Sequence, residues 1–184
     1  YQTTAANVGT AISYSRPLLA YPRVSYVDAI VARFLLNALT QILIASIIII
    51  GIVLFYDLSL DIDFFLCARA VAMALALGIG VGILNCYLMS MFSVWRFAWA
   101  VLNRPMFVIS GIFFLPDPLP EAMRTLLLYN PVIHPVMMMR RGIYGTYDGV
   151  YISELYVYMV ALALAALGML LLNRHHRTIL DEGA

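Results

Sequence analysis

The sequence contains no lysine: all eleven of its basic residues are arginines. The phosphate-binding loop of P-loop ATPases needs a lysine that contacts the β- and γ-phosphates. A chain without lysine cannot hydrolyse ATP by that route. Any work that ATP drives in this system must therefore use energy that a separate polypeptide supplies.

Charge of either sign is scarce. Only 11% of the residues are charged and 64% are hydrophobic, with a mean hydropathy of +0.92. Soluble domains carry roughly 25% charged residues. The composition therefore predicts an integral membrane protein. A net charge of +1 with scattered arginines argues against nucleic-acid binding, which needs a clustered basic surface.

Cysteine is also rare. Cys67 and Cys86 are the only two, and both lie within apolar runs. We interpret them as small core residues, because no second soft ligand for a metal lies near either one. The sequence begins at Tyr1 without an initiator methionine or a signal-peptide pattern, so we expect it to be the later part of a longer protein.

Long apolar runs predict an all-α, polytopic membrane protein that forms a single transmembrane domain over residues 1–184. About 20 residues at 1.5 Å per residue cross the hydrocarbon core. We expect four spans, a cytoplasmic region before them and a cytoplasmic tail after them. The spans are residues 27–56, 64–92, 95–115 and 151–172; the region is 1–26 and the tail is 173–184.

The stretch from Arg104 to Tyr147 is as apolar as a span, but prolines interrupt it at positions 116, 118, 120, 131 and 135. A proline inside a helix removes a backbone donor and clashes with the preceding turn. Irregular backbone at membrane depth survives only inside protein or against a water-filled cavity. We therefore predict a periplasmic re-entrant region over residues 116–147, in which helices at 119–129 and 132–144 enter the outer leaflet and turn back.

The arginines predict the orientation of the chain. Those near residues 16–33, 96 and 174–177 mark the cytoplasmic side, and Asp57, Asp61 and Asp63 form an outer loop. Arg124, Arg140 and Arg141 break this rule, so we expect each to have a function or a partner. We expect Arg69 to reach the headgroups rather than a pore.

Small and polar residues predict helix contacts. Gly78 and Gly82 have the G-x-x-x-G spacing, which indicates a packing surface or a subunit interface. Asn37, Thr40 and Gln41 favour interhelical hydrogen bonds over substrate contacts.

Three segments carry a resemblance to a known family. They read SRPLLAYPRVSYVDAIVARFLLN at 15–37, RPMFVISGIFFLPDPLP at 104–120 and NPVIHPVMMMRRGIYGTY at 130–147. In these segments the chain resembles the ABC-2 type exporter permeases, and within them the branch that exports capsular polysaccharide. The resemblance covers almost the whole chain. Permeases for O-antigen or teichoic acid remain the alternatives within the family.

The resemblance implies a six-span subunit of the bacterial inner (cytoplasmic) membrane, with an amphipathic N-terminal interface helix. The first two spans would then precede this sequence. It implies a permease homodimer with two ATPase subunits, which hold ATP and Mg²⁺ while this chain binds no cofactor. The cargo would be a lipid-linked polysaccharide, passed on to periplasmic export partners. By position, residues 5–15 would be the helix that couples to the ATPase, with Ala5, Asn7, Ile12, Tyr14 and Arg16 as candidate contacts.

Charge and aromatic content suggest a substrate path. Arg104, Arg140 and Arg141 are candidates because arginine offers a planar fork for carboxylate or phosphate groups. A pathway must also bind its cargo weakly enough to release it. For Arg104 the alternative is that Pro105 breaks the helix and the guanidinium satisfies freed carbonyls. Tyr144, Tyr147 and Tyr151 fit an interfacial belt or surfaces on which sugar rings stack.

Two other classes are less consistent with the residues. A membrane-embedded transferase needs convergent acids, bases or metal ligands, and we expect no catalytic residue or metal site here. A secondary transporter usually shows internal repeats with paired broken helices, whereas this sequence has one broken region.

Overall fold

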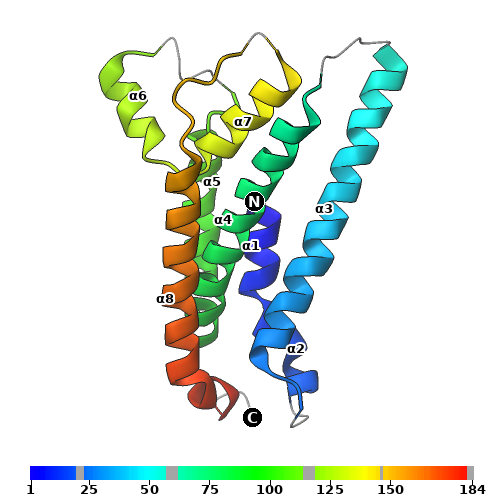
Figure 1. The fold of residues 1–184 in the computed structure, drawn as a ribbon. Helices are drawn as coiled ribbons and strands as arrows, with labels where there is room; N and C mark the ends of the chain where they lie inside the picture. The colour runs from blue at the N-terminus through cyan, green and yellow to red at the C-terminus, as the bar shows by residue number, and fades with distance from the viewer. Residues whose placement is uncertain (20–22, 57–61, 114–118, 146, 182–184) are drawn as a thin grey trace.

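A computed structural model describes residues 1–19, 23–56, 62–113, 119–145 and 147–181. Figure 1 shows these residues as an elongated helical bundle, with the hairpin α6–α7 at one end and the last turns of α8 at the other. Within the described ranges every regular element is a helix, which confirms the predicted all-α fold. The helices are α1 (Gln2–Gly9), α2 (Ala11–Leu19), α3 (Tyr26–Tyr56), α4 (Phe64–Met91), α5 (Trp95–Val108), α6 (Glu121–Leu128), α7 (Ile133–Ile143) and α8 (Glu154–Asp181).

Three of these helices are long and apolar enough to cross a membrane. The qualifying segments are Tyr26–Phe55, Phe64–Met91 and Glu154–His175. The first two match the spans predicted at 27–56 and 64–92 to within one residue at each end. The polytopic prediction is therefore confirmed, whereas the fourth span stays a prediction.

The segment predicted as a span at 95–115 differs in the structure. Helix α5 ends at Val108, so it has 14 residues and is about 21 Å long. Pro105 lies in its last turn, and the chain then turns through Gly111 at a φ of 76°. A positive φ is readily available only to glycine. Leu115, with Pro116 and Pro118, lies outside the described residues.

Helix α4 is the centre of the bundle because its small residues admit neighbours on two sides. A Cβ added to Gly78 would lie 2.8 Å from Cβ of Thr4 on α1. A Cβ added to Gly82 would lie 2.6 Å from Cβ of Val8 on the same helix. On the other side, a Cβ on Gly80 would lie 2.4 Å from the backbone oxygen of Ala161 in α8. The predicted small-residue surface therefore packs within this chain.

The N-terminal region, predicted as a cytoplasmic segment at 1–26, packs against α4. Helix α1 lies along the middle of α4, and Figure 1 places the N-terminus about halfway along the bundle. Val8, Ala11 and Ile12 share a buried cluster with Cys86 and Leu172. The side chains of Thr4 and Val8 fit the glycine surface of α4, and the cytoplasmic placement of residues 1–26 stays a prediction.

Helix α3 is attached mainly through its first half. The amide of Asn37 is 5% exposed; its Nδ2 donates to Thr4 Oγ1 at 2.9 Å, and its Oδ1 accepts from Asn7 Nδ2 at 2.7 Å. The predicted interhelical bonding is thus confirmed for Asn37, whereas Thr40 donates to the carbonyl of Leu36 in its own helix. Beyond Ala38, the apolar side chains of α3 are mostly exposed.

Helix α8 is offset from the predicted span at 151–172. It begins at Glu154 and continues to Asp181, so the predicted tail at 173–184 is helical for most of its length. A Cβ on Gly168 would lie 2.7 Å from the backbone nitrogen of Leu84, which shows how closely α8 lies against α4.

Candidate functional site

The hairpin α6–α7 forms where the prolines predicted two short helices. Pro120 precedes α6 as its N-cap, a position where the absent N–H of a proline costs little. Between the helices, Asn130 Oδ1 accepts from the backbone nitrogen of Val132 at 3.1 Å. Pro135 lies in the first turn of α7, where its missing donor would have had no partner within the helix.

The two helices of the hairpin are held very differently. Six residues of α7 are buried, whereas α6 has none. Met138 packs with Ala70 and Met73 of α4. The carbonyl of Gly142 accepts from the backbone nitrogen of Asp63 at 2.9 Å. The predicted helices at 119–129 and 132–144 are therefore present, and their entry into a membrane stays a prediction.

The turn between α6 and α7 is fastened to the start of α8. Tyr156 donates from its hydroxyl to the carbonyl of Tyr129 at 2.7 Å. The guanidinium of Arg124 lies 4.5 Å from the ring centroid of Tyr151, a cation–π contact. Arg124, one of the three arginines that we expected to have a function or a partner, thus has an aromatic partner.

A polar cavity of about 440 Å³ lies between the start of α4 and the α7–α8 connection. It is lined by Asp63, Leu66, Arg141, Gly145, Tyr147 and Asp148. Asp63 also caps α4, because its Oδ1 accepts from the backbone nitrogens of Phe65 and Leu66 at 2.9 and 3.1 Å. Two carboxylates, a guanidinium and a phenol suit hydrogen bonding to a hydroxyl-rich ligand.

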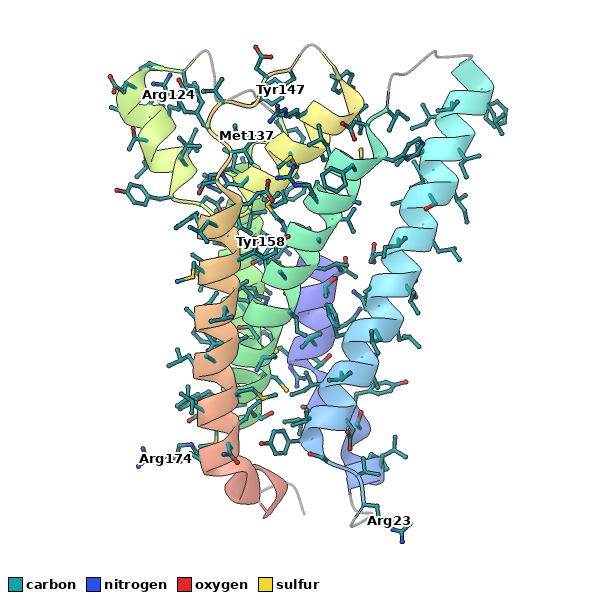
Figure 2. The ribbon with its side chains drawn as sticks, in the orientation of Figure 1. Arg23, Arg124, Met137, Tyr147, Tyr158 and Arg174 are labelled. Carbon is teal, nitrogen blue, oxygen red and sulfur yellow. The ribbon has the colours of Figure 1, made fainter. Side chains whose placement is uncertain are left out.

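The structure brings some of the predicted path residues together. Arg141 and Tyr147 line the same cavity; in Figure 2, Tyr147 lies at the end of the bundle that carries Arg124. Arg140 donates from Nη2 to the carbonyl of Ile112 at 2.7 Å, so it ties α7 to the segment after α5. Tyr144 is 59% exposed as the C-cap of α7.

Arg104 is exposed on α5 and is not among the residues that line the cavity. Among the described residues, no hydrogen bond joins the Arg104 guanidinium to a carbonyl freed by Pro105, which was its alternative role. Its part in a path stays a prediction.

The candidate coupling residues differ in exposure, and their contact with an ATPase stays a prediction. Ala5 is fully buried and Ile12 is 4% exposed within this chain. Asn7 bonds to Asn37 within the bundle. Tyr14 is 74% exposed. The guanidinium carbon of Arg33 lies 3.5 Å from the centroid of the Tyr14 ring. The side chain of Arg16 lies outside the described part of the chain.

Sequence reasoning assigned Arg69 to the headgroups, but the structure pairs it with Glu154 across α4 and α8. Asp63 and Asp148, which line the cavity, were not predicted as part of a site. The sequence signal for Asp63 was its place in the acidic loop predicted on the outer side. Asp57 and Asp61, the other members of that loop, lie outside the described residues.

Metal chemistry finds no support among the described side chains, where no three His, Cys, Asp or Glu residues gather. Figure 2 shows Arg23 and Arg174 at the end of the bundle opposite to Arg124 and Tyr147. Which end faces the cytoplasm stays a prediction from the arginines.

Comparison with known proteins identifies the family. The profile described as "ABC-2 type transporter" matches residues 4–144. The chain belongs to the ABC-2 type transporter family. The match covers helices α1 to α7, and so includes the glycine surface of α4 and the hairpin.

Two relatives of the chain are named for capsule export. The chain is 25% identical over 169 residues to the capsule polysaccharide export inner-membrane protein CtrC of Neisseria meningitidis serogroup A. It is 28% identical over 170 residues to the capsule polysaccharide export inner-membrane protein BexB of Haemophilus influenzae. Each alignment covers 92% of this chain and 64% of the relative, so the chain spans less than two thirds of those proteins.

Proposed function

We propose that this chain is part of the inner-membrane permease of an ATP-driven exporter that moves capsular polysaccharide. The observation that carries the proposal is the family match over residues 4–144 together with capsule-export relatives aligned over 92% of the chain. Three membrane-length helices and the absence of lysine are consistent with a transport subunit whose ATPase is a separate protein.

The partners follow from this role. The full-length permease forms a homodimer, binds two ATPase subunits that hold ATP and Mg²⁺, and delivers a lipid-linked polysaccharide to periplasmic export proteins. The ATPase binds near the end of α2 and the start of α3 rather than along α1. Tyr14 and Leu18 support this placement because they are 74% and 58% exposed, unlike Ala5 and Ile12.

The substrate leaves past the cavity at the outer end. Arg141 and Tyr147 line it, Tyr144 and Tyr151 lie on the α7–α8 connection that borders it, and Arg140 holds α7 in place. Aromatic faces and a few dispersed charges give contacts that tolerate many sugars and still release them. Arg104 contributes from α5.

Complementation in the native bacterium tests this proposal. Cells lacking the permease gene receive the full-length wild type, Arg141→Gln or Arg174→Gln, and polysaccharide is measured at the surface and inside the cell. Arg174 is the matched control because it is an exposed arginine at the opposite end. We expect the null strain to retain polysaccharide inside, Arg141→Gln to export several-fold less than wild type, and Arg174→Gln to export normally. Normal surface polysaccharide in the null strain would refute the function, and equal export by both variants would refute the role of Arg141.

A further inference from the structure

His134 bridges the hairpin and α8 through both of its ring nitrogens. Its side chain is 2% exposed. Nε2 lies 3.1 Å from the carbonyl oxygen of Leu128, at the end of α6, and Nδ1 accepts from the backbone nitrogen of Ser153 at 3.3 Å. A carbonyl can only accept and a backbone amide can only donate. The partners therefore fix the neutral ring with its proton on Nε2.

Other contacts converge on the same place. The rings of His134 and Tyr156 meet edge to face, with centroids 5.6 Å apart at 74°. The hydroxyl of Tyr156 is bonded to the carbonyl of Tyr129. Since no residue of α6 is buried, these contacts at its last turn hold α6 where hydrophobic packing does not.

A second proton on the ring would disturb this arrangement. It would sit on Nδ1, which accepts from Ser153 in the neutral ring, so that hydrogen bond would be lost; the carbonyl of Tyr151 offsets only part of the loss. The protonated ring would also be a charge in a buried site, which is costly without a carboxylate partner.

We propose that His134 is a pH-sensitive latch: the neutral ring docks the α6–α7 turn on the start of α8, and protonation releases it. The proposal concerns contacts within one chain, so it does not depend on the identity of the transported substrate.

The direction of the pH dependence follows from the pKa of His134. Burial lowers this pKa from its ordinary value of 6.5, and outweighs the carbonyls of Leu128 and Tyr151, which favour the charged ring. The docked state therefore binds fewer protons than the released state. Docking of the α6–α7 turn therefore weakens as the pH falls below about 6.5. His134 itself lies in α7, outside the three membrane-length helices.

Other ionisable groups lie on the elements around His134. They are Arg124 and Tyr129 from the α6 side, Tyr151, Glu154 and Tyr156 from the α8 side, and Arg69 of α4. Glu154 is paired with Arg69 and Arg124 with the ring of Tyr151. Histidine is the side chain whose ordinary titration falls between about pH 5 and 8.

Pulsed electron spin resonance on the full-length permease in nanodiscs tests the latch. Spin labels replace Met123 on α6 and Leu162 on α8, which are 59% and 68% exposed. The background carries Cys67→Ala and Cys86→Ala, and labelled chains are diluted with unlabelled ones to isolate distances within one chain. Distances are recorded from about pH 8 to about pH 5, the range in which histidine titrates.

We expect a single narrow distance at the high pH and a broad or longer distribution at the low pH. His134→Gln is the key variant, since its amide can donate to Leu128 and accept from Ser153 but does not titrate in this range. It should stay narrow throughout. An unchanged wild-type distance, or equal broadening in His134→Gln, would overturn the proposal.

A second variant keeps the test decisive if His134→Gln does not fold. Tyr156→Phe removes the hydroxyl bond to Tyr129 and leaves the titrating ring in place. Because the docked state is weakened by one hydrogen bond, release should begin at a pH about 0.5 to 1 unit higher than in wild type. An unshifted midpoint would contradict the latch.

Discussion

Helices α3 and α4 are both long enough to span a membrane, yet they are used in opposite ways. Helix α4 buries eleven of its 28 residues, and α1, α7 and α8 pack against it. Helix α3 has 31 residues, and beyond Ala38 its isoleucines and leucines are mostly exposed. Hydropathy therefore identifies a membrane helix but not what it faces. Small residues mark contacts within the chain, whereas branched apolar residues line the uncovered surface.

The largest expected effect comes from adding a methyl group to the crowded helix. In Gly80→Ala the new Cβ meets the backbone oxygen of Ala161 at 2.4 Å, and backbone cannot move aside as a side chain can. We expect the free energy of unfolding, measured by denaturant titration of the detergent-solubilised protein, to fall by about 1 to 3 kcal/mol.

Gly51→Ala on α3 is the matched control, since nothing lies within 4 Å of its added Cβ. It should leave stability unchanged or raise it slightly, because alanine favours helices over glycine. Equal losses in the two variants would mean that the contrast between α3 and α4 is not real.

A smaller effect is expected where the two regions are joined. Asn37→Leu removes the bonds to Thr4 and Asn7 and leaves their polar groups unsatisfied, at a cost of about 1 to 2 kcal/mol. Ser46→Ala serves as the control, because Ser46 donates to the carbonyl of Ile42 in its own helix. Thermal unfolding of the two variants in parallel measures the difference. If Ser46→Ala loses as much stability as Asn37→Leu, the bonds from Asn37 to α1 are not what attaches α3 to the bundle.

The smallest effect is expected where α4 and α8 begin. Arg69 and Glu154 form an ion pair, but their side chains are 39% and 27% exposed. Solvent screening then leaves a coupling of about 0.2 to 1 kcal/mol, measured by a double-mutant cycle with Arg69→Gln and Glu154→Gln. A coupling that is absent at low salt would show that the pair contributes nothing to packing of α8 on α4.

Local signals in the sequence predicted those parts of the fold that depend on residues close together in the chain. The apolar runs gave the ranges of α3 and α4, and the prolines gave the two short helices of the hairpin. The sequence could not show that Thr4 would lie against Gly78 or that Arg69 would pair with Glu154. These contacts join residues far apart in the chain, and their side chains have no distinctive local pattern.

The candidate site was predictable to a similar degree. Arg141 and Tyr147 were chosen for charge and aromatic character, and the fold places both at one cavity. Ala5 and Ile12 were chosen only by position relative to the next span, and they are buried. His134 gave no signal, because one histidine in an apolar run says nothing about the carbonyl and amide that will meet its ring.

The proposed export activity can be tested most directly in inverted membrane vesicles. These contain the full-length permease and its ATPase, and receive labelled lipid-linked capsular polysaccharide and ATP on the outside. The account predicts that label enters the vesicle lumen only when permease, ATPase and ATP are all present. Entry that continues without the permease, or without ATP, would contradict it.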